Sequence, residues 1–298
     1  HMNGLGISKF TMASHACEIL LPQFSAAAYI DAIGTHGCTW LTSVPTMLAL
    51  VAREDALLRA TDLSTVKIVA MGSAPVTQAL VDRLKSIFPG APVTNGYGTT
   101  ESGPIAFGAH PDGLPRPDLA LGYPLAGVNA RLVNGADQDA DQGVLHLKSP
   151  ALMTGYHKLP LKTAEALTAD GYYITGDIMR RDANGFYSFV GRDDDMFVCS
   201  GENIYPLQVE KMLESHGDIQ QACVVPASDE IRGRKPVAYI VAGPDSSLTE
   251  QAVKDYALAN APPHEHPRHV VFVAELPLAG TNKIDRNGLT KLAAEFSS

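Results

Sequence analysis

Apolar positions in the first 110 residues alternate between short continuous runs and stretches in which they recur every three or four residues. Residues 40–44 and 66–71 form two such runs, and the second ends at Gly72. Runs of this kind are typical of parallel strands buried on both faces. Between residues 78 and 88 the apolar side chains fall on one face of a helix: Leu80, Val81, Leu84, Ile87 and Phe88. This strand–helix–strand rhythm predicts an α/β layer with a parallel sheet.

The pattern changes near Leu121 and again after Gly191. Residues 121–191 hold short runs separated by turns such as Asn134-Gly135, which favours a small antiparallel barrel or sheet. Beyond them, Pro206 opens a helical pattern, and three strand-like runs follow, at residues 223–225, 237–241 and 269–273. We therefore predict an α/β protein with a large domain, 1–191, made of an α/β part (1–120) and a β-barrel part (121–191). A small α+β domain, 192–298, follows.

Composition and charge narrow the classes of partner. Apolar residues make up 45% of the 298 positions, enough to build a substantial core. The formal net charge of −9 comes without a basic stripe, which argues against a nucleic-acid or anionic-membrane partner. We find no apolar run of transmembrane length and no signal peptide. The four cysteines are widely spaced, as in reduced cytoplasmic proteins: Cys17, Cys38, Cys199 and Cys223.

Two polar loops follow predicted strands of the α/β part. In Gly72-Ser73-Ala74-Pro75 the small residues would let a flat ring lie against the backbone, although an ordinary connection has the same composition. In the second loop, 95–101, Tyr97 can stack on an aromatic base and the threonine hydroxyls can bind a phosphate. Glu101 can hold a hard cation there, or simply cap a helix.

Four later segments carry further candidate chemistry. Thr175-Gly176-Asp177 predicts a strand-end turn whose carboxylate can bind both hydroxyls of a ribose, or an Asx-turn. Gly191-Arg192 predicts a turn that offers donors to a phosphate or ribose. The three aspartates 193–195 fit a solvated loop better than a metal cluster, and Pro267 breaks any helical metal spacing within 264–269. Lys283 lies in a polar turn, where a lysine is commonly just solvated.

The order GSAP, YGTTE, TGD, GRDDD, SGENIYP, NKIDR resembles the adenylate-forming superfamily of acyl-CoA synthetases, non-ribosomal adenylation domains and luciferases. The resemblance covers nearly the whole chain. The segment from the GRDDD motif to SGENIYP looks most like the bacterial aryl- and acyl-CoA ligases, such as the halobenzoate ligases.

The resemblance implies roles for residues of the large domain. It places Gly72, Ala74 and Pro75 against the adenine of ATP or AMP, and it counts Gly98 among the cofactor-binding residues. Tyr97 would stack on that ring, Thr100 would contact the AMP phosphate and Glu101 would ligate Mg²⁺. Asp177 would bind the ribose hydroxyls.

Further roles fall in the small domain, which rotates between half-reactions in the family. Arg192 would contact the ribose or phosphate, and Asp194 falls on the hinge. Ser200 and Gly201 would meet the pantetheine of coenzyme A. Lys283 matches the catalytic lysine, with Asn282 where the family usually has glycine.

The resemblance thus implies an AMP-forming ligase that joins an aromatic or fatty acid to coenzyme A, with ATP and Mg²⁺. Family members are generally much longer and carry an early lysine-containing phosphate loop, which does not precede Gly4 here. We therefore expect a missing N-terminal segment, or self-association that covers the exposed sheet. Two alternatives are a non-catalytic nucleotide-binding or assembly fragment and a stand-alone adenylation domain for a carrier protein.

Overall fold

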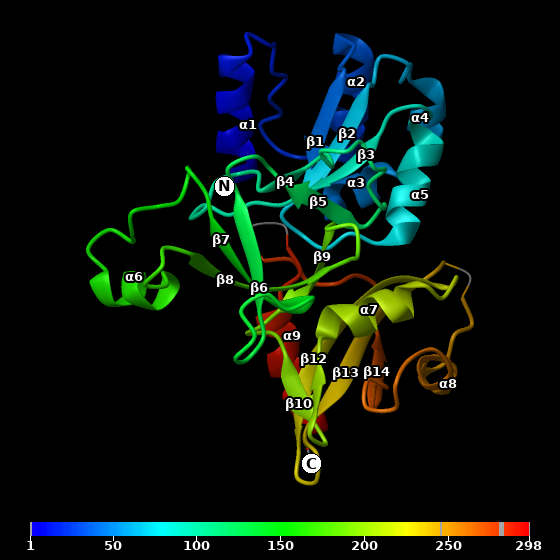
Figure 1. The fold of residues 1–298 in the computed structure, drawn as a ribbon. Helices are drawn as coiled ribbons and strands as arrows, with labels where there is room; N and C mark the ends of the chain where they lie inside the picture. Colours follow the sequence, from blue (N-terminus) through cyan, green and yellow to red (C-terminus); the bar gives the residue numbers. More distant parts are fainter. Residues whose placement is uncertain (1, 245, 280–282, 298) are drawn as a thin grey trace. The chain divides into compact units, whose positions relative to one another are not determined.

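The computed structural model describes residues 2–244, 246–279 and 283–297 (Figure 1). The chain divides into two compact units, His1–Phe189 and Val190–Ser298. Each unit has its own buried clusters of apolar residues.

The first unit opens with a parallel sheet surrounded by helices (Figure 1). The three strands lie in the order β1-β2-β3. The elements are α1 (Met2–Ala13), α2 (Ala26–His36), β1 (Trp40–Ser43), α3 (Pro45–Val51), α4 (Asp55–Ala60), β2 (Ile68–Gly72), α5 (Gln78–Ile87) and β3 (Val93–Gly96). Val69 and Met71 of β2 pack against Val81 and Leu84 on the apolar face of α5. The predicted α/β layer is therefore confirmed.

A six-stranded antiparallel sheet follows in the order β4-β5-β9-β8-β7-β6, and its strand β9 passes from the first unit into the second. Its elements are β4 (Phe107–Gly108), β5 (Ala120–Pro124), β6 (Asn129–Val133), β7 (Gln142–Lys148), α6 (Pro160–Ala166), β8 (Tyr173–Arg181) and β9 (Tyr187–Arg192). One face is buried by a cluster that includes Leu132, Leu145 and Met179. The sheet supplies the small antiparallel structure that the turn-rich pattern predicts.

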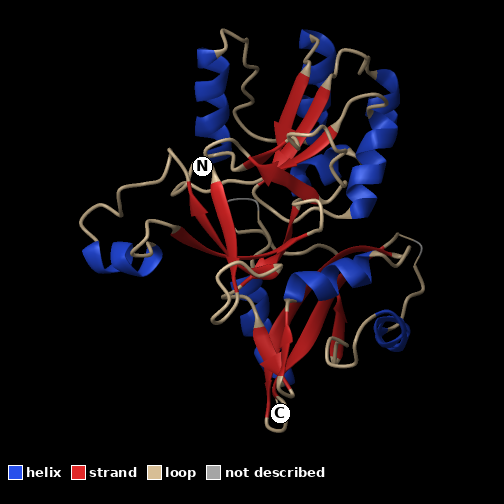
Figure 2. Cartoon of the chain, viewed as in Figure 1, coloured by secondary structure: helices blue, strands red, loops and turns tan. Residues whose placement is uncertain are grey.

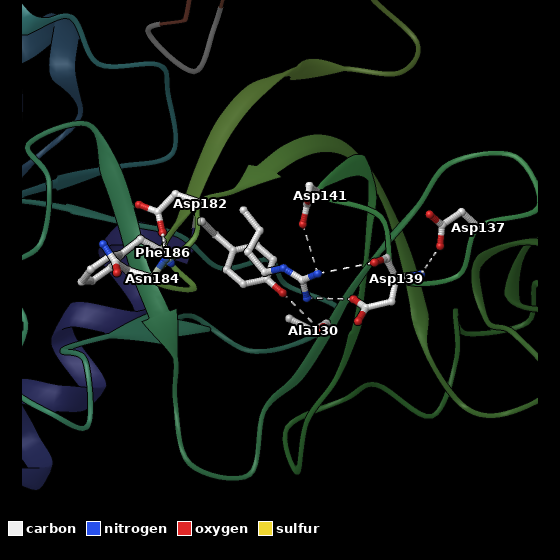
Figure 3. Close-up of polar contacts among 9 residues, drawn as sticks. Ala130, Asp137, Asp139, Asp141, Asp182, Asn184 and Phe186 are labelled. Carbon is white, nitrogen blue, oxygen red and sulfur yellow. Dashed lines mark hydrogen bonds and ion pairs between the residues drawn. The ribbon is translucent and has the colours of Figure 1, made fainter.

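Aspartates hold the turns of this sheet in place, as Figure 3 shows. Asp182 accepts hydrogen bonds from the backbone N–H groups of Asn184 (2.9 Å) and Phe186 (3.0 Å), which closes the turn between β8 and β9. Nearby, the guanidinium of Arg181 forms an ion pair with Asp139 at 2.8 Å. Both contacts are short polar bonds within the sheet, so the aspartates of this region serve its folding.

The second unit is built on a five-stranded sheet covered on both faces (Figure 2). Its elements are β10 (Phe197–Cys199), β11 (Glu202–Ile204), α7 (Pro206–Glu214), β12 (Ile219–Asp229), β13 (Gly233–Ala242), α8 (Glu250–Asn260), β14 (His269–Phe272), α9 (Arg286–Ala293) and the 3₁₀ turn η1 (Ala294–Phe296). The strand order is β11-β10-β13-β12, and β14 pairs with β13 in parallel.

Period-two alternation explains why β12 reads as a continuous apolar run. Ala222 and Val224 pack in the cluster that includes residues of α7 and α8. Cys223 and Val225 pack on the opposite face, with Leu289 of α9. Because successive side chains of a strand point to opposite faces, both parities must be apolar here. The unit combines helices with a mostly antiparallel sheet, and the α/β fold class of the chain is confirmed.

Within the described residues, none of the helices combines the length and the apolar character that a membrane crossing requires.

Candidate functional site

Two loops leave the carboxyl ends of neighbouring parallel strands. Gly72 and Gly96, the last residues of β2 and β3, are paired in register. A Cβ atom on Gly72 would lie 2.6 Å from the carbonyl oxygen of Gly96, so only glycine allows the strands to approach this closely. Ser73 follows in the left-handed region (φ +66°). Ala74 is half-buried and Pro75 is exposed, so the segment lies at the surface before α5 begins.

The loop after β3 is closed by its own hydrogen bonds. Thr99 and Gly103 exchange two backbone bonds of 3.0 Å each, and the Thr99 hydroxyl lies 2.8 Å from that of Ser102. A Cβ atom on Gly98 would stand 2.2 Å from the carbonyl carbon and oxygen of Pro104. Thr100 is exposed beside this closed turn. Its position is therefore fixed by the surrounding backbone.

We expect Gly98→Ala to lower the free energy of unfolding of the first unit by about 1–3 kcal/mol, because a backbone carbonyl cannot yield space cheaply. The midpoint of urea denaturation, followed by the fluorescence of the single tryptophan, Trp40 in β1, measures this loss. Gly96→Ala is the control, since the nearest atom to its Cβ would be the Met71 carbonyl oxygen at an ordinary 3.7 Å. Equal midpoints for the two variants would contradict the expected clash.

Asp177 lies inside strand β8, so the predicted strand-end turn is wrong. Ile174 pairs with His146 and Ile178 pairs with Val144, so residues 175–177 stand opposite Leu145 alone. Gly176 has φ +71°, which allows the strand to bulge. The Thr175 hydroxyl donates to the Leu145 carbonyl oxygen (2.8 Å) and accepts from the Asp177 N–H (3.0 Å).

The bulge brings Asp177 to the loop after β3. The Tyr97 hydroxyl donates a short hydrogen bond to Oδ2 of Asp177, which is 7% exposed. Burial, and then the charge of Asp177, raises the pKa of Tyr97 well above its usual value, so the hydroxyl remains a donor. The Tyr97 ring lies 5.8 Å from that of Phe107 at a tilt of 53°. Two predicted site residues from different sheets therefore meet directly.

Another tyrosine, Tyr156, contacts Glu101, the other carboxylate residue predicted for the site. The Tyr156 hydroxyl donates to Oε1 of Glu101 at 3.0 Å, and the backbone N–H of Met153 bonds to the Glu101 carbonyl oxygen at 2.7 Å. Burial and then the bond to Glu101 raise the pKa of Tyr156. Burial and then the charge of Glu101 do the same to the pKa of Tyr173. Tyr156 is a residue that the sequence reasoning missed.

Glu101 suits a hard cation. A carboxylate that accepts from one hydroxyl keeps acceptor capacity for a metal, and oxygen donors of this kind are those that Mg²⁺ prefers. Among the described residues, no group of three or more His, Cys, Asp and Glu side chains is arranged to bind a metal. In the 264–269 segment, His266 is buried and the ring of His269 stacks on Phe296 at 4.8 Å.

In the second unit, Arg192 and Asp194 contact each other. Arg192 is the last residue of β9, so Gly191-Arg192 belongs to a strand and the predicted turn is wrong. Its Nε donates to Oδ1 of Asp194 at 2.8 Å and its Nη2 to Oδ2 at 3.2 Å. This two-pronged contact holds the pKa of Asp194 below its usual range. Asp194 itself is exposed.

Ser200 and Gly201 form the two-residue turn between β10 and β11. Cys199 pairs with Glu202 across it. Both turn residues have positive φ, +54° at Ser200 and +88° at Gly201, as a type I′ hairpin requires. The Ser200 N–H donates to the Arg232 carbonyl oxygen at 3.1 Å. The turn is thus exposed at its tip and tied at its base.

Lys283 is exposed, and its backbone is tied to a neighbouring segment. The Lys283 carbonyl oxygen accepts from the Ala279 N–H at 2.7 Å. Residues 280–282 of the same predicted motif lie outside the described residues. Three residues further on, Arg286 forms an ion pair with Glu210 of α7 at 2.6 Å. Glu210 was also missed, although a charged residue directly after the core residue Val209 is a visible signal.

Two regions of the chain match models of one enzyme family. Residues 1–157 match the family model of AMP-binding enzymes, and residues 208–283 match that of the AMP-binding enzyme C-terminal domain. The chain therefore belongs to the AMP-binding enzyme family.

Individual relatives carry informative names. The 4-coumarate–CoA ligase-like 2 protein of Arabidopsis thaliana is 31% identical over 284 residues, which are 92% of this chain and 49% of the relative. The solved structure of the amide bond synthetase McbA from Marinactinospora thermotolerans matches with a TM-score of 0.88 at 26% identity, over 99% of this chain and 59% of that one.

The anthranilate CoA ligase AuaEII, solved in complex with anthranoyl-AMP, matches with a TM-score of 0.82 at 26% identity. The match covers 94% of this chain and 55% of that one. This chain spans about half the length of the curated relatives it matches.

Proposed function

We propose that the protein containing this chain is an AMP-forming ligase that converts a carboxylic acid into an acyl-adenylate and then into a coenzyme A thioester. The observation that carries the proposal is the bulge in β8, which places Asp177 against Tyr97 at the carboxyl end of β3. Ligands of parallel sheets bind beyond the carboxyl ends of the strands. Membership of the AMP-binding enzyme family supports it.

The nucleoside of ATP or AMP is assigned to the first unit. Its adenine lies along Gly72, Ala74 and Pro75, and the Tyr97 ring stacks on it. Gly98 keeps the backbone of the second loop close to the nucleotide, and the exposed Thr100 hydroxyl binds the phosphate. The ribose hydroxyls donate to the Asp177 carboxylate, which Thr175 and Tyr97 orient.

Glu101 is the proposed ligand of Mg²⁺, with Tyr156 fixing one of its oxygens. When bound, Mg²⁺ supplies positive charge beside the phosphates of ATP. The role of this chain is to hold Glu101 at the turn closed by Thr99 and Gly103. Such preorganisation avoids reorienting the carboxylate during the reaction.

The reaction has two balanced steps. In the first, a carboxylate oxygen of the acid attacks the α-phosphorus of ATP, the bond from that phosphorus to the bridging oxygen breaks, and pyrophosphate leaves. In the second, the thiol sulfur of coenzyme A attacks the acyl carbon, its proton is lost, and AMP leaves. The exposed Lys283 stabilises the charge that develops on the phosphoryl oxygens in the first step.

The second unit supplies different groups to the two steps. A change of backbone angles at Asp194 rotates the unit, which withdraws Lys283 and presents the Ser200-Gly201 turn to the pantetheine. Arg192 releases Asp194 to contact the ribose or phosphate side. The tied base and exposed tip of that turn suit insertion beside a narrow ligand.

An amine is the alternative acceptor of the acyl group. The matched McbA structure is that of an amide bond synthetase, so an amine in place of the thiol is the alternative second step. The matched ligase AuaEII is named for an aromatic acid, which favours aromatic over fatty acids as substrates. A non-catalytic nucleotide-binding fragment and a carrier-protein adenylation domain remain the competing functions.

The test incubates the protein that contains this chain with ATP, Mg²⁺, coenzyme A and a panel of aromatic and aliphatic acids. AMP and pyrophosphate are expected to appear with at least one acid and not in its absence. ADP in their place would contradict the proposal, since it requires attack at another phosphorus. Acyl-adenylate that reacts only with added amines would select the alternative acceptor, and nucleotide binding without turnover would select the non-catalytic function.

A further inference from the structure

A buried ion pair lies three residues from Lys283. Nη1 and Nη2 of Arg286 donate to Oε1 and Oε2 of Glu210 at 2.7 and 2.6 Å. The side chains are 25% and 4% exposed, respectively. Burial by itself would lower the pKa of Arg286, but the charge and hydrogen bonds of Glu210 keep that pKa above its usual value. The contact is therefore a bidentate pair whose carboxylate is buried and whose guanidinium is partly buried.

The pair joins three elements of the second unit. Oε1 of Glu210, on α7, also accepts from the backbone N–H of Val224 at 2.7 Å, and Nη1 of Arg286 donates to the Val224 carbonyl oxygen at 3.2 Å. Arg286 is the first residue of α9, and Asp285 caps that helix by accepting from Gly288 N–H at 3.0 Å. The start of α9 is thus fixed against both α7 and β12.

Backbone hydrogen bonds extend this anchored region from Arg286 back to Lys283. The Asp285 N–H donates to the Pro277 carbonyl oxygen at 2.8 Å, and Ile284 forms an antiparallel bridge with Leu278. The Ala279 N–H then donates to the Lys283 carbonyl oxygen at 2.7 Å. The backbone of residues 283–285 is therefore bonded to that of residues 277–279, while the Lys283 side chain stays exposed.

We propose that Glu210 and Arg286 are positioning residues for Lys283, acting through the backbone of 283–286 to set where its ammonium group stands. This rests on the proposed function, in which Lys283 serves the first step only. Lysine has a long, flexible side chain, so the accuracy of its charge depends on where its Cα is held. A displacement of about 1 Å in a reacting group can cost on the order of 10²-fold in rate.

Stability alone is a weak explanation for this ion pair, because removing two charges from water is energetically unfavourable. Buried pairs can often be replaced by packed apolar residues without loss, and their best-attested use is to fix register. Glu210 and Arg286 meet that description, because each also bonds the backbone of Val224. The pair fixes one geometry, and apolar packing at the same place would leave several.

The first measurement does not depend on activity. Hydrogen exchange at the amides of Ala279 and Asp285 is compared in the wild-type protein, Glu210→Gln and Arg286→Lys. Both variants remove the bidentate geometry: Glu210→Gln keeps the size of the side chain, and Arg286→Lys keeps the positive charge. Exchange at the two amides is expected to accelerate at least about tenfold, since their bonds lie in the segment that Arg286 anchors. Exchange at Ile240, in the core of β13, reports the global stability of the unit, so only acceleration at Ala279 and Asp285 beyond that at Ile240 counts as a local effect.

The second measurement separates the half-reactions of the protein that contains this chain. Acid-dependent pyrophosphate exchange is expected to fall about ten- to a hundredfold in both variants, and thioester formation from supplied acyl-adenylate to stay within about twofold. Glu250→Gln is the matched control, because Glu250 pairs with Lys254 at 2.7 Å and bonds Val270 N–H at 3.3 Å in the same unit. It is expected to leave both half-reactions and both amides unchanged.

Several outcomes would overturn the proposal. One is unchanged exchange at Ala279 and Asp285, and another is an equal loss in the two half-reactions. If either single variant does not fold, the double variant Glu210→Met with Arg286→Leu restores packing and is expected to keep the selective loss of the first step. Full activity of that double variant would mean that packing suffices. A wild-type protein that forms no acyl-adenylate would defeat the proposed function, and amide exchange would still decide whether the pair fixes the segment.

Discussion

Lys283→Ala is expected to slow acyl-adenylate formation by about 10²–10³-fold, the usual effect of removing one preorganised charge-stabilising group. Thioester formation from supplied acyl-adenylate is expected to stay near the wild-type rate, because the charge on the phosphoryl oxygens develops only in the first step. Pyrophosphate exchange and single-turnover thioester formation, in the protein that contains this chain, measure the two steps separately.

Lys291→Ala provides the control for this variant. Lys291 is an exposed lysine of α9, so its removal changes the net charge of the same unit by the same amount. It is expected to leave both steps unchanged. If Lys283→Ala slowed both steps equally, the separate use of this lysine in one orientation of the second unit would be wrong.

Glu210→Ala is expected to lower the free energy of unfolding of the second unit by about 3–5 kcal/mol, because it leaves the Arg286 guanidinium buried without its partner. The quarter exposure of Arg286 places the loss at the lower end of that range. Global amide exchange at Ile240, which is fully buried in β13, measures the change.

The double variant Glu210→Met with Arg286→Leu tests the physical cause. Once both charges are gone, no buried ion remains unpaired, so most of the lost stability is expected to return. A loss in Glu210→Ala of less than about 1 kcal/mol would mean that water reaches the guanidinium and replaces its partner.

Local patterns predicted the elements of both units well. The apolar face from Leu80 to Ile87 became α5, and the run ending at Gly72 became β2, because burial of one face or of a whole strand leaves a direct trace in the sequence. Pro206 was correctly placed at the first position of α7. The loops after β2 and β3 follow from the same patterns, since glycines end both strands.

Contacts between distant positions were not predictable in this way. Thr175-Gly176-Asp177 has the composition of a turn, and only its pairing with β7 reveals the bulge. Tyr156 and Glu101 are 55 positions apart, and Arg286 and Glu210 are 76 apart. A bond at that separation is set by the packing of whole elements, so no local pattern encodes it.

The bulge in strand β8 serves the candidate site and not the pairing of the sheet. Three residues, 175–177, face one residue of β7, so a strand shorter by two residues would form an unbroken ladder. Two residues are a full pleat, and every remaining side chain would keep its inward or outward direction. The alternation of side chains in the sheet therefore does not require the extra length. Deletions in this strand could preserve the barrel-like scaffold while abolishing its carboxylate, which makes β8 the place where a folded but non-binding homologue would first differ.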